Sequence, residues 1–211
     1  MIKAVAFDIG ETLIDETRIW SRWADRLGVP RLTFLGVLGA LAALDRPHRE
    51  VFDFFRPGFD LDSELERWAA EEPDGLRENF DEADLYPDVP GCLARLLDRG
   101  LKVVVAGNQP VQARLALERM DLGVAAILVS AEIGAEKPSP AFFRRVVEAC
   151  GVAPNEILYV GDRLDNDVLP ARAAGLRTVL LKRGPWGYLH AERPEAAAAD
   201  QVIDSLDRLA T

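Results

Sequence analysis

The chain has 211 residues, of which 49% are apolar and 28% charged, an ordinary composition for one or two globular domains. Its net charge of −10 argues against nucleic acid as a partner, because contacts to a phosphate backbone need a basic surface. Cys92 and Cys150 form no disulfide framework or zinc motif, and no apolar run reaches the roughly 18 residues of a membrane span, so we expect a cytoplasmic protein without a membrane partner.

The chain begins with a predicted strand, "KAVAF" at 3–7, and then changes character. Residues 15–86 contain no convincing strand, and the stretches 19–28, 33–44 and 61–72 have helical spacing. We predict that 15–86 form a separate α-helical domain inserted into the fold. Its aromatic residues either pack the helices together or line a pocket for an apolar ligand; they are Trp20, Trp23, Phe34, Phe52, Phe54, Phe55, Phe59 and Trp68.

From residue 87 onward, short β-branched runs alternate with helical segments. We predict strands at 102–106, 125–130, 156–161 and 177–181, with a weaker strand at 201–203, and helices at 111–120, 141–150 and 167–174. We expect the first four of these strands and 3–7 to be buried on both faces, and 183–190 to form a loop. The alternation predicts an α/β fold, a Rossmann-like parallel sheet core of 1–14 and 87–211 with the helical domain inserted.

Polar residues follow four of the predicted strands. Asp8, Asn108 and Asp162 come directly after strands, and Lys137 lies in the loop that follows another. In parallel α/β sheets, ligands bind beyond the carboxyl ends of the strands. Each of these residues has a structural alternative, as a turn residue, a solvated charge or a helix cap. Together they predict a site at one edge of the sheet.

The segment "GDRLDND" at 161–167 adds a cluster of acids. Asp162, Asp165 and Asp167 fall within six positions, more carboxylates than helix capping requires. Magnesium prefers oxygen ligands and commonly uses one or two carboxylates with water and substrate phosphate oxygens. We therefore predict Mg²⁺ as the cofactor, bound by Asp8 and Asp162, with Asp167 holding a water.

These motifs resemble those of the haloacid dehalogenase superfamily. "DIGET" at 8–12 matches its nucleophile motif, and "VVVAGNQ" at 103–109 matches its second motif, with Gly107 at the hydroxyl position. "GAEKPSP" presents the motif lysine, Lys137, and "GDRLDND" is the acidic motif. The resemblance implies that Asp8 is the nucleophile, that the helical insertion is a cap domain, and that the carbonyl of Gly10 joins Asp8, Asp162 and Asp167 around the metal. It also implies catalytic roles for Lys137 and Asp162, and a phosphate-binding role for Gly107, Asn108 and Lys137.

Two positions depart from the family pattern. Gly10 replaces a second aspartate that protonates the leaving group, and Gly107 lacks the usual hydroxyl. Glu11 replaces that acid only if the chain turns sharply at Gly10, because successive side chains of an extended chain point to opposite faces. Otherwise Glu11 lies in a solvated turn or pairs with an arginine such as Arg18.

Three functions remain open from the sequence. The first is a magnesium-dependent hydrolase of a small phosphorylated metabolite, favouring acidic leaving groups. The second is a dehalogenase-type carbon–halogen hydrolase, although the metal motif argues against it. Phosphonate-cleaving members of the family form a Schiff base on a lysine of the insertion, and the absence of lysine between Lys3 and Lys102 excludes that chemistry. The third is a binding or regulatory protein with an impaired site.

Two further questions remain open from the sequence. Trp186 or His190 either contacts substrate or packs its loop, and the oligomeric state is either monomer or homodimer.

Overall fold

The computed structural model describes residues 1–73 and 79–211, which divide into two compact units. The sheet unit comprises Met1–Asp15 and Asp81–Thr211, and the helical unit comprises Glu16–Phe80. Residues 74–78 of the predicted helical domain lie outside the described residues. The roles of core and cap for the two units remain a prediction.

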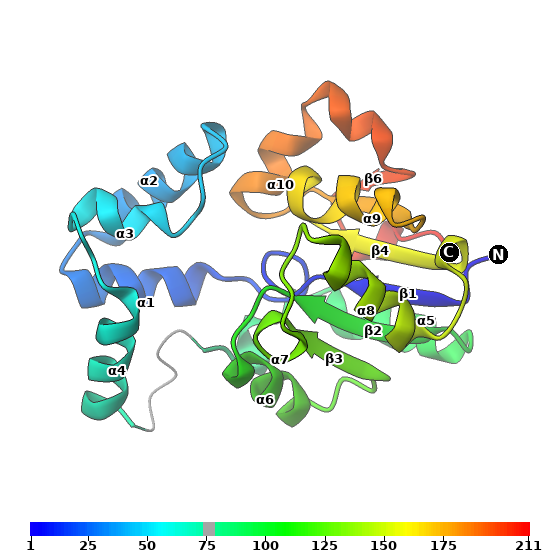
Figure 1. The fold of residues 1–211 in the computed structure, drawn as a ribbon, viewed down its shortest axis with the longest axis horizontal. Helices are drawn as coiled ribbons and strands as arrows, with labels where there is room; N and C mark the ends of the chain where they lie inside the picture. Colours follow the sequence, from blue (N-terminus) through cyan, green and yellow to red (C-terminus); the bar gives the residue numbers. More distant parts are fainter. Residues whose placement is uncertain (74–78) are drawn as a thin grey trace. The chain divides into compact units, whose positions relative to one another are not determined.

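The sheet unit is built on six parallel strands in the order β3-β2-β1-β4-β5-β6, which confirms the predicted α/β fold (Figure 1). The order reverses at β1, because β2 and β3 extend the sheet on one side and β4, β5 and β6 extend it on the other. The strands are β1 (Ala4–Phe7), β2 (Lys102–Gly107), β3 (Ala126–Val129), β4 (Ile157–Gly161), β5 (Arg177–Leu181) and β6 (Gln201–Ile203).

The central strands are buried on both faces, as continuous apolar runs predict. The edge strand β3 is an exception, since three of its four residues are only half-buried. The expectation of full burial was wrong there because a single strand, β2, neighbours it. On one face, Ala4, Ala6 and Tyr159 pack in a common cluster with Phe142 and Phe143 of α8 (Pro140–Cys150).

Helices connect the strands of the sheet unit, and α8 lies in front of the sheet in Figure 1 with α5 behind it. Ser139 caps α8, its hydroxyl accepting from the Ala141 N–H at 3.2 Å. The remaining helices are α5 (Val89–Asp98), α6 (Val111–Arg119), α7 (Ser130–Ile133), α9 (Leu169–Ala173) and α10 (Gly184–Ala191).

Two predicted boundaries in this unit were wrong. The predicted helix at 167–174 is instead a π-helical turn, Leu164–Val168, followed by the short α9. The predicted loop at 183–190 is mostly α10. Pro185 is compatible with this helix because it occupies the first turn, where its missing N–H has no intrahelical partner to lose.

The helical unit contains α1 (Thr17–Leu27), α2 (Arg31–Ala43), α3 (Glu50–Phe55) and α4 (Leu61–Glu71). Its aromatic residues largely contact one another: the Trp23 ring lies 4.8 Å from both Phe52 and Trp68, and all three side chains are buried. Phe54, 64% exposed, is the outlier. Packing therefore accounts for most of this aromatic group. Within the described chain, no single helix is long and apolar enough to span a membrane. Only α1 and α2 taken together reach that length and apolar composition, and they are bent by 116° relative to each other.

Candidate active site

The sheet register brings the predicted site residues together at one edge. Phe7 pairs with Val105 on β2 and with Val160 on β4, so Asp8 follows β1 level with the ends of both neighbours. The Asp8 N–H donates to the Val160 carbonyl at 2.9 Å. This edge lies at the carboxyl ends of the strands where the strand order reverses, the usual ligand position of such sheets.

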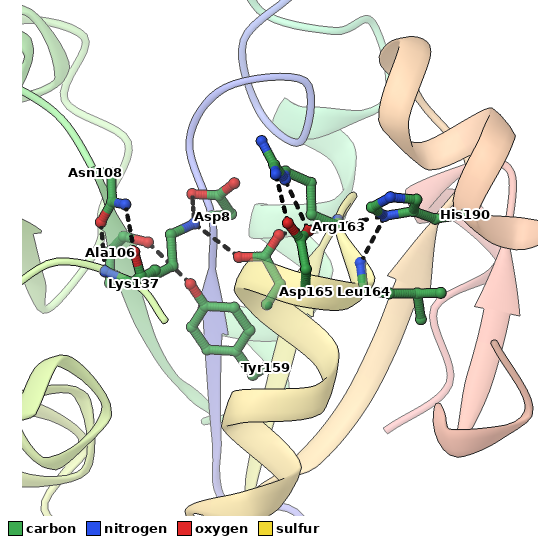
Figure 2. Close-up of polar contacts among 10 residues, drawn as sticks. Asp8, Ala106, Asn108, Lys137, Tyr159, Arg163, Leu164, Asp165 and His190 are labelled. Atoms are coloured by element: carbon green, nitrogen blue, oxygen red, sulfur yellow. Dashed lines mark hydrogen bonds and ion pairs between the residues drawn. The ribbon is translucent and has the colours of Figure 1, made fainter. Parts of the chain in front are cut away.

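Lys137 lies between two carboxylates. Its Nζ donates to Asp8 Oδ1 at 2.5 Å (Figure 2). The same Nζ donates to Asp167 Oδ1 at 2.7 Å, and the lysine side chain is 3% exposed. Burial alone would lower the pKa of Lys137, but the charges of Asp167 and Asp8 outweigh it and hold that pKa well above its ordinary value. The ammonium group therefore stays charged at neutral pH.

Asn108 fixes the main chain at Lys137 through both ends of its amide. Its Oδ1 accepts from the Lys137 N–H at 2.7 Å, and its Nδ2 donates to the Lys137 carbonyl at 3.0 Å (Figure 2). Asn108 is thus engaged as a support for Lys137. A direct contact of Asn108 with phosphate remains a prediction.

Three buried carboxylates converge beside the lysine. Ligand oxygens of Asp8, Asp162 and Asp167 lie within 4.8 Å of one another. Burial raises the pKa of Asp167 to about 6, with Asp8 adding to the shift and Lys137 opposing it, and burial likewise raises the pKa of Asp162 well above its ordinary range. Since one ammonium cannot balance three carboxylates, these residues fit a divalent cation, which takes oxygen ligands.

Glycine is required next to Asp167. A Cβ at Gly161 would lie 2.4 Å from Cγ of Asp167, so any side chain at 161 would displace this carboxylate. Asp167 also accepts from the Arg163 N–H at 3.0 Å, a bond to the charged form of the acid. The close approach of strand and turn explains why a glycine precedes the acidic segment.

The third acid of this segment, Asp165, lies apart from the cluster. Its side chain is exposed and accepts from Nε and Nη2 of Arg163 at 3.0 and 2.6 Å (Figure 2). The Arg163 guanidinium lies 4.9 Å from the Trp186 ring, and Nδ1 of His190 accepts from the Leu164 N–H at 2.9 Å. Both Trp186 and His190 are buried, which fits packing of α10, and a contact of either residue with substrate remains a prediction.

The two positions that depart from the motif lie around Asp8. A Cβ at Gly107 would lie 3.0 Å from Asp8 Oδ1 and 2.9 Å from Cδ1 of Ile9, so the missing hydroxyl leaves that space to these side chains. The sharp turn after Asp8 is present, with the N–H groups of Thr12, Leu13 and Ile14 all pointing to the Ile9 carbonyl. The left-handed residue of the turn is Glu11, with φ of 51°, where glycine is usually preferred.

Three further residues near the site escaped the sequence analysis. Tyr159, within β4, donates its hydroxyl to the Ala106 carbonyl at 3.2 Å, and a lone tyrosine in an aliphatic strand was the available signal (Figure 2). Tyr86 donates to Glu11 Oε2 at 2.6 Å. Arg183 donates to the Thr12 carbonyl at 2.8 Å, lies 4.1 Å from the Tyr86 ring, and pairs with Asp88. No local pattern in the sequence links these last partners.

Comparisons with known proteins agree with this geometry. Residues 2–175 match the family model described as a haloacid dehalogenase-like hydrolase. A glyceraldehyde 3-phosphate phosphatase of Methanopyrus kandleri is 32% identical, with 88% of this chain and 86% of the relative covered. A phosphoserine phosphatase of Thermus thermophilus is 34% identical, with 86% and 74% covered.

A solved structure shares the fold over nearly its whole length. The crystal structure of a phosphatase of this superfamily from Thermococcus onnurineus superposes with a TM-score of 0.61 at 26% identity, covering 98% of this chain and 95% of the other. The chain therefore belongs to the haloacid dehalogenase-like hydrolases, a family in which both relatives named above are phosphatases.

Proposed function

We propose that the chain is a magnesium-dependent phosphatase of a small phosphorylated metabolite, with Asp8 as its nucleophile. The observation that carries the proposal is the convergence of Asp8, Asp162 and Asp167 within 4.8 Å, with Lys137 bonded to two of them. Asp8, Asp162, Asp167 and the carbonyl of Gly10 would hold Mg²⁺. The cation would polarise phosphate oxygens and offset their charge.

The proposed reaction has two displacements at phosphorus. A carboxylate oxygen of Asp8 forms a bond to phosphorus while the ester P–O bond breaks, and the leaving oxygen takes a proton from water. Water then attacks phosphorus and breaks its bond to the Asp8 oxygen, which releases inorganic phosphate and restores the Asp8 carboxylate, and the proton that this water loses neutralises the hydroxide left by the first step. Lys137 keeps its positive charge throughout and offsets the charge of the phosphoryl group, while Asn108 holds its main chain in place.

The absence of a side chain at Gly10 bears on the substrate. A positioned general acid contributes most when the leaving group is weakly acidic, typically about 10²–10⁴-fold. We therefore expect acidic leaving groups, as in aryl phosphates, to react fastest. The relatives named above for glyceraldehyde 3-phosphate and phosphoserine, with a phosphoglycolate phosphatase of Aliivibrio fischeri that is 29% identical over 99% of this chain, point to small three-carbon or two-carbon phosphates as natural candidates. The helical unit would act as the cap that selects among them.

The test is phosphate release from a panel that contains these three compounds and p-nitrophenyl phosphate, with magnesium or with chelator. We expect magnesium-dependent release by the wild type and none by Asp8→Asn. Mass spectrometry of rapidly quenched protein should detect phosphate on Asp8 in the wild type. Release that continues equally in Asp8→Asn would rule out this nucleophile.

A non-catalytic binding function is the second candidate, because Gly10 and Gly107 both lack side chains that handle the phosphoryl group. Thermal stabilisation by magnesium with inorganic phosphate, without turnover of any panel member, would favour it. The dehalogenase alternative predicts chloride release from 2-haloacids that chelator does not affect. The carboxylate cluster gives that alternative no support.

A further inference from the structure

Glu11 occupies a backbone conformation that does not suit it. Its φ of 51° lies in the left-handed region, which glycine adopts freely and which most other side chains avoid. The preceding residue, Gly10, does not have a positive φ, so the left-handed conformation falls on the glutamate and not on the neighbouring glycine. A strained non-glycine residue next to a proposed active site is a reason to look for a function of its side chain.

The surroundings hold the Glu11 side chain in one place. Tyr86 donates its hydroxyl to Glu11 Oε2 at 2.6 Å. Burial and the charge of Glu11 raise the pKa of Tyr86 far above its ordinary value, so the phenol stays protonated and remains a donor. Gly184, with φ of 55°, makes room for the glutamate, because a Cβ there would lie 2.6 Å from Cγ of Glu11.

The same helix that contacts Glu11 also contacts Asp162. Gly184 begins α10, and Gly187 follows within the first turn of that helix. A Cβ at Gly187 would lie 3.4 Å from Cβ of Asp162, just as one at Gly184 would meet Glu11. Glu11 thus lies on the Asp162 side of the site. The pKa of Asp162 is raised by burial and then by the charges of Asp167, Asp8 and Glu11. Glu11 is therefore close enough to interact electrostatically with Asp162.

We propose that Glu11 is an outer carboxylate of the magnesium site, a positioning residue that accepts hydrogen bonds from the cation's hydration water while Tyr86 holds it in place. The proposal rests on the metal site proposed above. Glu11 lies outside the group of three converging carboxylates, which fits an outer rather than a direct role. Oε2 of Glu11 already accepts a hydrogen bond from Tyr86, so the carboxylate is held in place as a hydrogen-bond acceptor. Outer partners of this kind commonly change metal affinity about 10- to 100-fold.

The test is magnesium binding to the full chain by isothermal titration calorimetry, without substrate. Glu11→Gln keeps the size and an oxygen for Tyr86 but removes the charge, so we expect the Mg²⁺ dissociation constant to rise about 10-fold or more. Glu11→Asp restores the charge and should recover part of that loss. Glu192→Gln is the matched control, since Glu192 is an exposed carboxylate bound to Lys182 at 2.7 Å, and its magnesium binding should equal that of the wild type.

Glu11→Gly separates a functional role from a structural one. It removes the side chain and relaxes the left-handed backbone, so the melting temperature of the metal-free protein should hold or rise while magnesium affinity falls. A purely structural glutamate would instead lose melting temperature and leave the affinity unchanged. Tyr86→Phe keeps the charge but removes the donor, and we expect a smaller loss of affinity than in Glu11→Gln.

The outcomes distinguish this inference from the proposed function. Wild-type affinity in both Glu11→Gln and Glu11→Gly would overturn the role of Glu11 and leave the phosphatase proposal intact. A wild type that binds no magnesium would overturn both. Reduced affinity in the Glu11 variants, with normal affinity in Glu192→Gln, would support the role of Glu11 even if no phosphate ester on the panel were hydrolysed.

Discussion

A methyl group at position 161 would collide with Asp167, which makes Gly161→Ala a direct test of how tightly the site is packed. The new Cβ would lie 2.4–2.6 Å from three atoms of Asp167, whereas ordinary contact begins at 3.4 Å, so the carboxylate has to move by about 1 Å. Asp167 is fully buried and has no solvent to move into. Overpacking of this kind costs about 1–3 kcal/mol.

The displacement also strains two hydrogen bonds of Asp167, to Lys137 Nζ at 2.7 Å and to the Arg163 N–H at 3.0 Å. Losing one bond to a charged group costs about 1.5–3 kcal/mol, so we expect the free energy of unfolding in urea to fall by about 2.5–6 kcal/mol in total. Magnesium affinity should fall as well.

The matched control is Gly91→Ala, in α5 of the same unit. There the nearest atom to a new Cβ is Nη1 of Arg95 at 3.6 Å, and the backbone is not left-handed. An alanine in a helix should gain up to about 1 kcal/mol over glycine. If Gly161→Ala unfolded at the same urea concentration as Gly91→Ala and bound magnesium normally, the close packing of strand and acidic turn argued above would be refuted.

Other expectations concern the charges and supports of the site. Since burial raises the pKa of Asp167 from 3.8 to about 6, the metal-free folded protein keeps a proton that the unfolded chain releases. Stability should therefore fall as pH rises from about 4 to about 6. Asp167 contributes on the order of 3 kcal/mol of this fall, and Asp162, whose pKa burial also raises, adds to it, so Asp167→Asn should make this part of a urea-unfolding profile shallower without abolishing it. Asn108→Ala removes both bonds to the Lys137 main chain and should cost about 1–3 kcal/mol in urea unfolding and lower kcat. Gly10→Asp should raise kcat/KM for alkyl phosphates far more than for p-nitrophenyl phosphate, and an equal change for both would show that no acid is missing.

The sheet and its site edge could be predicted because they depend on local patterns. β-branched runs such as "KVVVA" specify buried parallel strands, and the residue after each strand must reach the same edge. The convergence of Asp8, Lys137 and Asp167 follows from this topology, since the lysine and both acids come from loops at the same end of the sheet.

The supporting contacts could not be predicted because they join residues far apart in the chain. Tyr86 reaches Glu11 across 75 positions, and Arg183 reaches the Thr12 carbonyl across 171. The helix Gly184–Ala191 was also missed, because its glycine and proline residues are typical of a loop. In the structure this segment is helical and buries Trp186 and His190. The side chain of Glu11 depends on its own left-handed backbone, which no periodicity reveals.

The balance of charge at the site gives a reason for the order in which its ligands bind. Asp8, Asp162 and Asp167 with Lys137 leave two negative charges when all are ionised. At an effective dielectric constant near 20, a unit charge about 5 Å away repels another by roughly 3 kcal/mol, so a phosphate dianion meets a strong barrier. A divalent cation matches the excess charge and removes this barrier. Inorganic phosphate should therefore bind only after magnesium, and Glu11, by adding a further negative charge nearby, should make that order stricter.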